Sequence, residues 1–277
     1  MQYSSLGKGK KMKPEMMKDW MLLWIRSWFN EKGADSKAVI GLSGGKDSTV
    51  CAYLLTQALG KDRVVPVLMP NGDQADIDDS YEICKLLDLK PVVMNIKAMY
   101  SDLMGRIENA FFTSISDNKL FTTNTPARLR MVTLYGIAAA VGGYVCNTCN
   151  RSEDYVGYST KYGDSCGDFS LLANLTVTQV YELADVLGVP EKFGHKTPSD
   201  GMCGKSDEDN MGFTYAELDK YIETYGRDDS ISSETREKIV KMHQNPNTEL
   251  KMLPMANPFG KVSSTANEST YLLDYML

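Results

Sequence analysis

The sequence of 277 residues has little of what several common kinds of site require: it contains two histidines and six cysteines. Six cysteines in a chain of this length do not form the disulfide framework of a small secreted domain, and they indicate reduced thiols. The apolar run Trp20–Ile25 has six residues, whereas a signal peptide needs about 7–15 and a membrane span about 20. We therefore expect a cytoplasmic protein that does not enter a membrane.

A surplus of positive charge is also missing. The chain has 30 lysines and arginines against 36 acidic residues, which gives a net charge of −6. A nucleic-acid-binding surface needs clustered cations, and the one basic cluster, Lys8–Lys13, lies in an arm near the N-terminus. No nucleic-acid partner is expected. The ordinary composition, with 43% hydrophobic and 24% charged residues, predicts a folded globular chain.

Residues 15–29 have the pattern of an amphipathic helix, because Trp20, Trp24 and Trp28 follow one another at four-residue intervals. The stripe fits two interpretations. It packs on the core of its own chain, or it forms a contact between subunits, where aromatic residues are enriched. The chain is accordingly divided into an N-terminal helical segment, residues 1–35, and a single domain over residues 36–277.

Between residues 38 and 147, short apolar runs alternate with helical patterns. This alternation predicts an α/β fold with a doubly wound parallel sheet flanked by helices. Ligands of such sheets bind beyond the carboxyl ends of the strands, which places residues 43–48, 69–73 and 148–153 around one site. The predicted strands are 38–42, 64–69, 91–96 and 144–147; the predicted helices are 48–59, 77–87, 99–111 and 127–141, with a polar loop over 113–124.

Beyond residue 155 the alternation ends. Helices are expected at 176–187, where a threonine cap begins the helix, at 215–225 and at 233–243. The segment 197–212 is rich in Ser, Asp, Gly and Lys. We interpret it as a mobile loop that closes over the site, with an ordinary surface loop as the alternative.

The strongest feature is Gly41-Leu-Ser-Gly-Gly-Lys-Asp-Ser48, which follows the first predicted strand and opens the first helix. Adjacent glycines let the backbone turn sharply and approach a ligand closely. The free amides of the helix start, with the hydroxyls of Ser43 and Ser48, favour an anion such as a phosphate. The spacing is neither that of a Walker A loop nor that of the Rossmann fingerprint. Asp47 is a candidate magnesium ligand, since Mg²⁺ takes carboxylate and phosphate oxygens.

Ser-Gly-Gly-x-Asp-Ser resembles the pyrophosphate loop of the N-type ATP pyrophosphatases, which have the Rossmann-like fold of the adenine nucleotide alpha-hydrolases and cleave ATP between its α and β phosphates. Over about residues 36–225 the chain is also similar to ammonia-dependent NAD synthetase. Six further segments carry this resemblance in the family's order: residues 69–74 (MPNGDQ), 124–130 (NTPARLR), 150–153 (NRSE), 157–164 (GYSTKYGD) with Asp168, 196–199 (KTPS) and 207–215 (DEDNMGFTY).

The resemblance implies a ligase with ATP, deamido-NAD and ammonia as substrates and Mg²⁺ as cofactor. The nicotinate carboxylate attacks the α-phosphorus of ATP, giving an acyl-adenylate and pyrophosphate, and ammonia then releases AMP and NAD. Implied ATP contacts are Gly41, Leu42, Ser43, Gly44, Gly45, Lys46, Asp47, Ser48, Thr148 and Ser199; implied deamido-NAD contacts are Arg128, Lys161 and Asp168; implied metal ligands are Asp47 and Glu153; and Asp47, Lys161 and Asp168 are the candidate catalytic residues.

Several of these residues also have plainer interpretations. Arg128 is alternatively a surface arginine at a helix start, and Thr148 a simple helix cap. The sequence departs from the family pattern at Val177, where the family commonly has a lysine associated with the ATP phosphates. Lys46, Lys196 and Lys205 are the candidates to supply that charge. The family's basic C-terminal residues are missing as well, so no substrate contact is expected over residues 249–254.

Two rival interpretations use the same loop. The first is a tRNA-modifying, sulfur-transferring ATP pyrophosphatase, in which Cys146 and Cys149 with Cys166 and Cys203 form a redox or metal site. A second Cys-x-x-Cys is missing and the charge does not suit tRNA, so buried structural cysteines are preferred. The second rival is a non-catalytic nucleotide sensor, which the pair of Asp47 and Glu153 disfavours.

The length bears on the nitrogen donor. Glutamine-dependent NAD synthetases add a whole amidase domain, for which 277 residues leave no room beside the synthetase core. Free ammonia is therefore the expected donor. Because members of the family are typically homodimers, the resemblance also implies a homodimer.

Overall fold

The computed structural model describes residues 12–74, 76–196 and 206–244. Its sheet has five parallel strands in the order β3-β2-β1-β4-β5. The chain runs outward from β1 to β3 and then returns to β4 on the other side of β1, which confirms the predicted doubly wound α/β fold. The strands are β1 (Lys37–Gly41), β2 (Val64–Leu68), β3 (Val92–Val93), β4 (Gly143–Asn147) and β5 (Phe169–Ser170).

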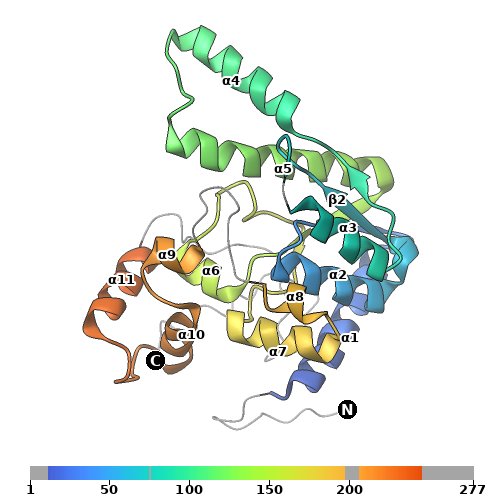
Figure 1. The fold of residues 1–277 in the computed structure, drawn as a ribbon. Helices are drawn as coiled ribbons and strands as arrows, with labels where there is room; N and C mark the ends of the chain where they lie inside the picture. The colour runs from blue at the N-terminus through green and yellow to red at the C-terminus, as the bar shows by residue number, and fades with distance from the viewer. Residues whose placement is uncertain (1–11, 75, 197–205, 245–277) are drawn as a thin grey trace.

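Helices cover both faces of the sheet (Figure 1). Helices α1 (Pro14–Lys32), α2 (Lys46–Leu59) and α7 (Val177–Leu187) pack against one another on one face, and α5 (Lys119–Val141) packs on β1 and β4 from the other. Successive strand residues point to opposite faces, so Ala38 and Ile40 join the larger core with α1, α2 and α7, while Val39 joins the smaller core with α5.

The remaining helices lie around this body. A third apolar cluster joins α6, α9, α10 and α11, which form the lobe at the left of Figure 1. Their bounds, with those of α3, α4, α8 and one turn of 3₁₀ helix, are: the turn Lys61–Arg63, α3 Ile77–Leu86, α4 Lys97–Phe111, α6 Arg151–Val156, α8 Glu191–Gly194, α9 Asp207–Met211, α10 Tyr215–Thr224 and α11 Ser233–His243.

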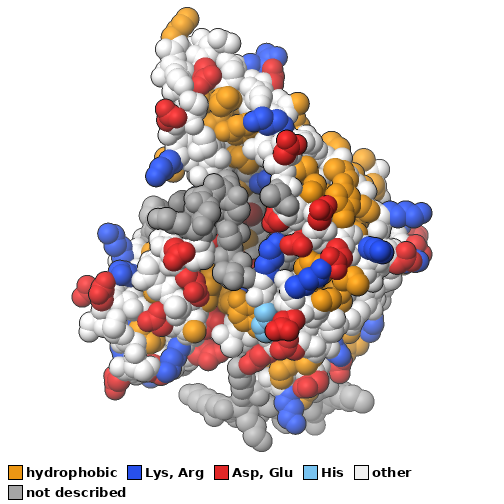
Figure 2. Space-filling model, in the orientation of Figure 1, with side chains coloured by type: hydrophobic (Ala, Val, Ile, Leu, Met, Phe, Trp, Pro, Cys, Tyr) orange, Lys and Arg blue, Asp and Glu red, His pale blue; other side chains and the backbone are white. Residues whose placement is uncertain are grey.

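Helix α4 and the first half of α5 form an arm that projects from the body (Figure 1). Large apolar side chains remain at its surface: Phe111 is 72% exposed, Phe112 96% and Leu120 75%. Hydrophobic side chains are visible on the arm in Figure 2. Nothing within the described part of the chain covers these residues, and exposed apolar groups of this size commonly mark an interaction surface.

The tryptophan stripe packs on the core of its own chain. Trp24 is 5% and Trp28 6% exposed, and the ring of Trp28 lies 5.1 Å from that of Tyr144 and 4.7 Å from that of Phe169. Helix α1 is therefore part of the main core. No helix within the described ranges combines the length and the hydropathy needed to cross a membrane.

Three predicted boundaries are wrong. Helix α5 begins at Lys119, where Asn118 caps it by accepting from the Phe121 amide, so half of the predicted polar loop is helical although Pro126 lies inside the helix. The third strand is reduced to Val92–Val93. It is an edge strand with one neighbour, and beyond Val93 its pairing with β2 continues only as isolated hydrogen bonds, such as that from the Met94 amide to the Leu68 carbonyl. Part of the predicted loop 197–212 is α9, begun by a capping box at Ser206.

Candidate active site

The loop between β1 and α2 has the backbone that a phosphate site needs. Gly44 has a φ of +81°, and a Cβ at this position would lie 3.0 Å from Cβ of Asp79, so glycine is required. The Ser48 hydroxyl lies 3.1 Å from the Ser43 hydroxyl and donates to the Gly45 carbonyl at 3.2 Å. Among the described residues, no side chain caps the first amides of α2, so these amides can receive an anion.

Asn150 joins the two predicted metal ligands. It is fully buried, and its Nδ2 donates to Asp47 Oδ1 at 3.2 Å. At the same time it caps α6: its Oδ1 accepts from the Glu153 amide, and Glu153 Oε2 accepts from the Asn150 amide, both at 3.0 Å. The sequence interpretation assigned Asn150 no role, although asparagine followed three residues later by glutamate indicates a capping box.

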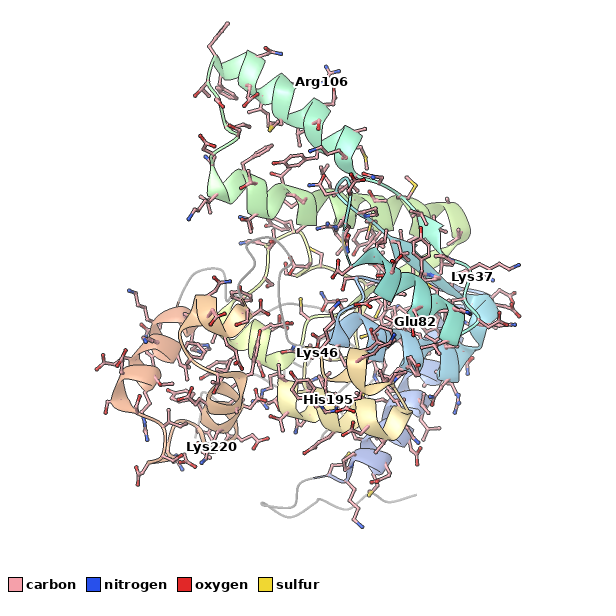
Figure 3. All side chains as sticks on the ribbon, viewed as in Figure 1. Lys37, Lys46, Glu82, Arg106, His195 and Lys220 are labelled. Atoms are coloured by element: carbon pink, nitrogen blue, oxygen red, sulfur yellow. The ribbon has the colours of Figure 1, made fainter. Side chains whose placement is uncertain are left out.

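Lys46 lies within this group of charges, where α2, α6 and α7 approach one another (Figure 3). Its Nζ donates to Asp47 Oδ2 at 2.6 Å. Burial alone would lower the pKa of Lys46, but the charges of Asp47 and Glu153 outweigh burial and raise it, so the lysine stays protonated.

Glu153 has a carboxyl group whose charged form is disfavoured. Burial, followed by the negative charge of Asp47, raises the pKa of Glu153 to about 8, although Lys46 and the Asn150 amide act in the opposite direction. When the pKa of a carboxyl group is raised in this way, a further cation placed near it stabilises its charged form.

The two carboxylates suit a magnesium ion that shares its coordination with a substrate. Mg²⁺ is usually held by one or two carboxylates together with phosphate oxygens and water. Burial and the charge of Asp47 raise the pKa of Glu153, and a further cation would favour its charged form. Within the described ranges, no group of three or more His, Cys, Asp or Glu residues could hold a metal by itself. Asp47 and Glu153 therefore fit an ion brought with a polyphosphate.

The predicted dinucleotide contacts lie in the segment before β5 and on the neighbouring helix α5. Arg128 Nε donates to the Lys161 backbone carbonyl at 3.1 Å, so the Arg128 side chain lies against the backbone of the segment that carries Lys161. Arg128 lies in the middle of α5, which corrects the expectation that it opens a helix. Asp168 Oδ2 accepts from the Val145 amide at 2.7 Å, and burial, with Asp168 nearby, raises the pKa of Tyr135 to about 12.

Arg130 is a cation that the sequence interpretation missed. Its Nε donates to the Met69 carbonyl at 3.0 Å, at the carboxyl end of β2. Burial lowers the pKa of Arg130, and Asp164 offsets this only in part. Arg130 is thus a half-buried guanidinium at the edge of the sheet where ligands bind. Two arginines at positions i and i+2 of a helix point in different directions, and sequence alone gave no signal to choose between them.

Of the other residues with a predicted role, some lie in the described part of the structure and some do not. Thr148 follows β4, but the cap of α6 is Asn150, so the alternative of Thr148 as the cap is wrong. Lys196 binds Asp79 at 2.6 Å and Asp76 at 3.3 Å. Three residues with a predicted role lie outside the described residues: Ser199, Cys203 and Lys205.

The Cys-x-x-Cys segment is buried in the fold. Cys146 is 3% and Cys149 5% exposed, and the Cys149 thiol donates to the Asp164 carbonyl at 3.3 Å. Burial raises the pKa of the Cys51 thiol, to which Cys146 is hydrogen-bonded. Within the described ranges, Cys146, Cys149 and Cys166 are not part of a group of three His, Cys, Asp or Glu residues that could hold a metal. The burial of Cys146 and Cys149 agrees with the structural interpretation of these cysteines.

Comparison with known proteins identifies the family. A model of the NAD synthase family matches residues 18–253. The NH₃-dependent NAD⁺ synthetase of Pyrococcus furiosus is 35% identical over 228 residues, which cover 78% of this chain and 86% of the relative. The structure is similar to that of NMN synthetase from Francisella tularensis (TM-score 0.76, 31% identity, 88% of this chain and 99% of the other). It is also similar to an NH₃-dependent NAD synthetase from Campylobacter jejuni (TM-score 0.63, 26% identity, 83% and 95%). On these grounds the chain belongs to the NAD synthase family.

Proposed function

We propose that the protein is an ammonia-dependent NAD synthetase, a ligase that converts deamido-NAD, ATP and ammonia into NAD, AMP and pyrophosphate. The observation that carries this proposal is the joining of Asp47 and Glu153 through Asn150 beside the open amides of α2. That arrangement combines a phosphate-binding helix start with a pair of carboxylates, in a chain whose family membership comes from independent comparisons.

In this reaction the loop between β1 and α2 holds the phosphates of ATP. The amides after Gly45 and the hydroxyls of Ser43 and Ser48 face the departing pyrophosphate and stabilise its charge. Thr148 and Ser199 remain predicted ATP contacts. Helix α2 adds the positive end of its dipole at the same point.

We infer that Asp47 and Glu153 bind Mg²⁺ together with ATP. When bound, the ion neutralises the triphosphate and assists the departure of pyrophosphate. Asn150 fixes the orientation of both carboxylates, and Lys46 and the Asn150 amide keep Glu153 partly compensated before ATP arrives.

The nicotinate end of the substrate is assigned to the segment before β5 and to α5. Arg128, which is bonded to the backbone carbonyl of Lys161, and Lys161 are proposed to supply positive charge for the anionic substrate, and Arg130 adds a third cation at the end of β2. Asp168 is proposed to lie beside the pyridine ring, near the entry of ammonia. Its contribution to the reaction is orientation, since effective positioning of two reactants lowers the barrier strongly.

A mononucleotide substrate is the second candidate. The similar structure from Francisella tularensis is described as an NMN synthetase and is covered to 99% by this chain. Amidation of nicotinate mononucleotide uses the same acyl-adenylate chemistry on the same carboxylate, so the residues around Asp47 serve both reactions.

The experiment is to measure AMP and pyrophosphate release with ammonium and each nicotinate substrate in turn. Higher kcat/KM with deamido-NAD supports the first proposal, and higher kcat/KM with the mononucleotide supports the second. AMP release with neither substrate would contradict both. Replacing ammonium by glutamine tests the nitrogen donor, and Asp47→Asn should abolish turnover.

We also propose a cytoplasmic homodimer. The arm of α4 and α5 presents Phe111, Phe112 and Leu120 to the surroundings, and a second copy that covers them would remove this apolar area from water. The packing of Trp24 and Trp28 inside the chain leaves the arm as the better surface for such a contact. Sedimentation of the protein and of a Phe112→Asp variant tests it: the variant should be a monomer if the arm is the interface.

A further inference from the structure

Lys46 occupies an uncommon place for a lysine, because its side chain is 2% exposed. Lysine is seldom fully buried unless it is paired. Its Nζ lies 2.6 Å from Asp47 Oδ2, 5.9 Å from the ring centre of Tyr181 on α7 and 5.7 Å from that of Tyr215 on α10. Aromatic faces stabilise a cation that has lost its water. Lys46 is therefore a built-in cation of the phosphate loop.

The start of α7, in contrast, has its amides engaged within the protein. Val177 is 1% exposed, and its amide donates to Ser152 Oγ at 3.1 Å. The amide and hydroxyl of Thr178 donate to Asp219 Oδ2 at 2.7 Å and 2.6 Å, and Ser152 also donates to Asp219. These amides are thus not available to a phosphate, and the residue at 177 carries no charge.

Lys46 brings its charge to the same neighbourhood from another helix. Tyr215 belongs to the apolar cluster of Val177, and Tyr181 packs against that cluster. The ammonium thus lies over two rings that pack with Val177, the first residue of α7. Lys196 is a weaker candidate for this role, because Asp79 and Asp76 already take its charge.

We propose that Lys46 is an internal counterion that changes partner during turnover. In the free enzyme its ammonium neutralises Asp47; once ATP is bound with its metal, the ammonium turns to the triphosphate and stabilises the departing pyrophosphate. The proposal rests on the proposed function, since it requires ATP as a substrate. It also makes Lys46 and Val177 a compensating pair, in which the cation of the phosphate site comes from the first residue of α2 rather than from α7.

The test is Lys46→Met, which keeps the length of the side chain and removes its charge. Two quantities should change in opposite directions. Mg²⁺ alone, titrated without nucleotide, should bind about tenfold more tightly, because Asp47 no longer has a competing cation. Turnover should fall about 100-fold, the usual effect of removing one preorganised stabilising group. Damage to the fold would weaken both.

The matched control is Lys220→Met, which removes an exposed lysine paired with Asp228 at 3.1 Å in the outer lobe; it should change neither quantity. Mg²⁺ binding that is unchanged or weaker in Lys46→Met would overturn the counterion role, and unchanged turnover would overturn the phosphate role. Adding Val177→Lys to Lys46→Met should raise turnover above that of the single variant, and no increase would refute the compensation.

Failure of the proposed function gives a different result. In that case the wild-type protein releases no AMP with either nicotinate substrate, while the Mg²⁺ titration of Lys46→Met still reports whether the lysine competes for Asp47.

Discussion

Replacing Asn150 by alanine tests whether one side chain holds the two carboxylates of the site together. The variant loses the cap of α6, which is worth about 1 kcal/mol. It also loses the bond to Asp47 at 3.2 Å, and a hydrogen bond to a charged group contributes about 1.5–3 kcal/mol. The free energy of unfolding should therefore fall by about 3 kcal/mol.

The assay is thermal unfolding of the metal-free protein beside a matched control. Asn118 caps α5 in the same way, with its Oδ1 accepting from the Phe121 amide at 3.1 Å, but it is exposed and has no bond to Asp47. Asn118→Ala should lower the midpoint by about 2–4 °C and Asn150→Ala by about 6–12 °C, at about 2–4 °C per kcal/mol for a domain of this size.

Asn150→Asp separates the capping of α6 from the hydrogen bond to Asp47. Aspartate caps a helix as well as asparagine does, but it places a carboxylate oxygen where a donor faced Asp47. We expect this variant to lose turnover as strongly as Asn150→Ala. Equal melting shifts for Asn150→Ala and Asn118→Ala, or full activity of Asn150→Asp, would refute the reasoning.

Three further predictions concern stability. The pKa of Glu153 is about 8 in the folded protein, against an ordinary value of 4.5, so between these pH values the folded state keeps a proton that the unfolded state releases. The free energy of unfolding of the metal-free protein should therefore fall, as the pH rises through this range, by up to about 1.4 kcal/mol per pH unit. Denaturant unfolding at several pH values measures this slope, and Glu153→Gln should flatten it. Trp28→Ala should cost about 3–5 kcal/mol by emptying the space beside Tyr144, and a loss below 1 kcal/mol would mean that α1 is not part of the core. Gly167→Ala would put a Cβ 2.8 Å from the Asn147 amide nitrogen, so its melting temperature should fall, and an unchanged value would contradict the close approach of β4 to this segment.

The sequence predicted most of what is local. The loop from Gly41 to Ser48 was found because glycines, hydroxyls and a helix start are neighbours in the chain, and the predicted family and reaction are confirmed by the comparisons. The strand alternation likewise predicted the sheet, because buried parallel strands are continuous apolar runs.

What the sequence did not predict depends on distant pairs. Asn150 and Asp47 are 103 positions apart, so no spacing rule connects them. Lys46 could be named as a phosphate contact, but its burial beneath Tyr181 and Tyr215 depends on how α7 and α10 pack on α2. The start of α5 was predicted at residue 127, whereas the cap at Asn118 begins the helix about two turns earlier, with Pro126 inside it.

The buried carboxylate of Asp219 has a mechanical consequence. It receives bonds from Ser152 on α6 and from Thr178 on α7, and it belongs to α10. Separating α10 from α6 and α7 would leave the Asp219 charge without these partners in the protein interior, which is costly. We therefore expect helices α6, α7 and α10 to move together, so that a closing motion over the phosphate loop would carry Glu153 with it.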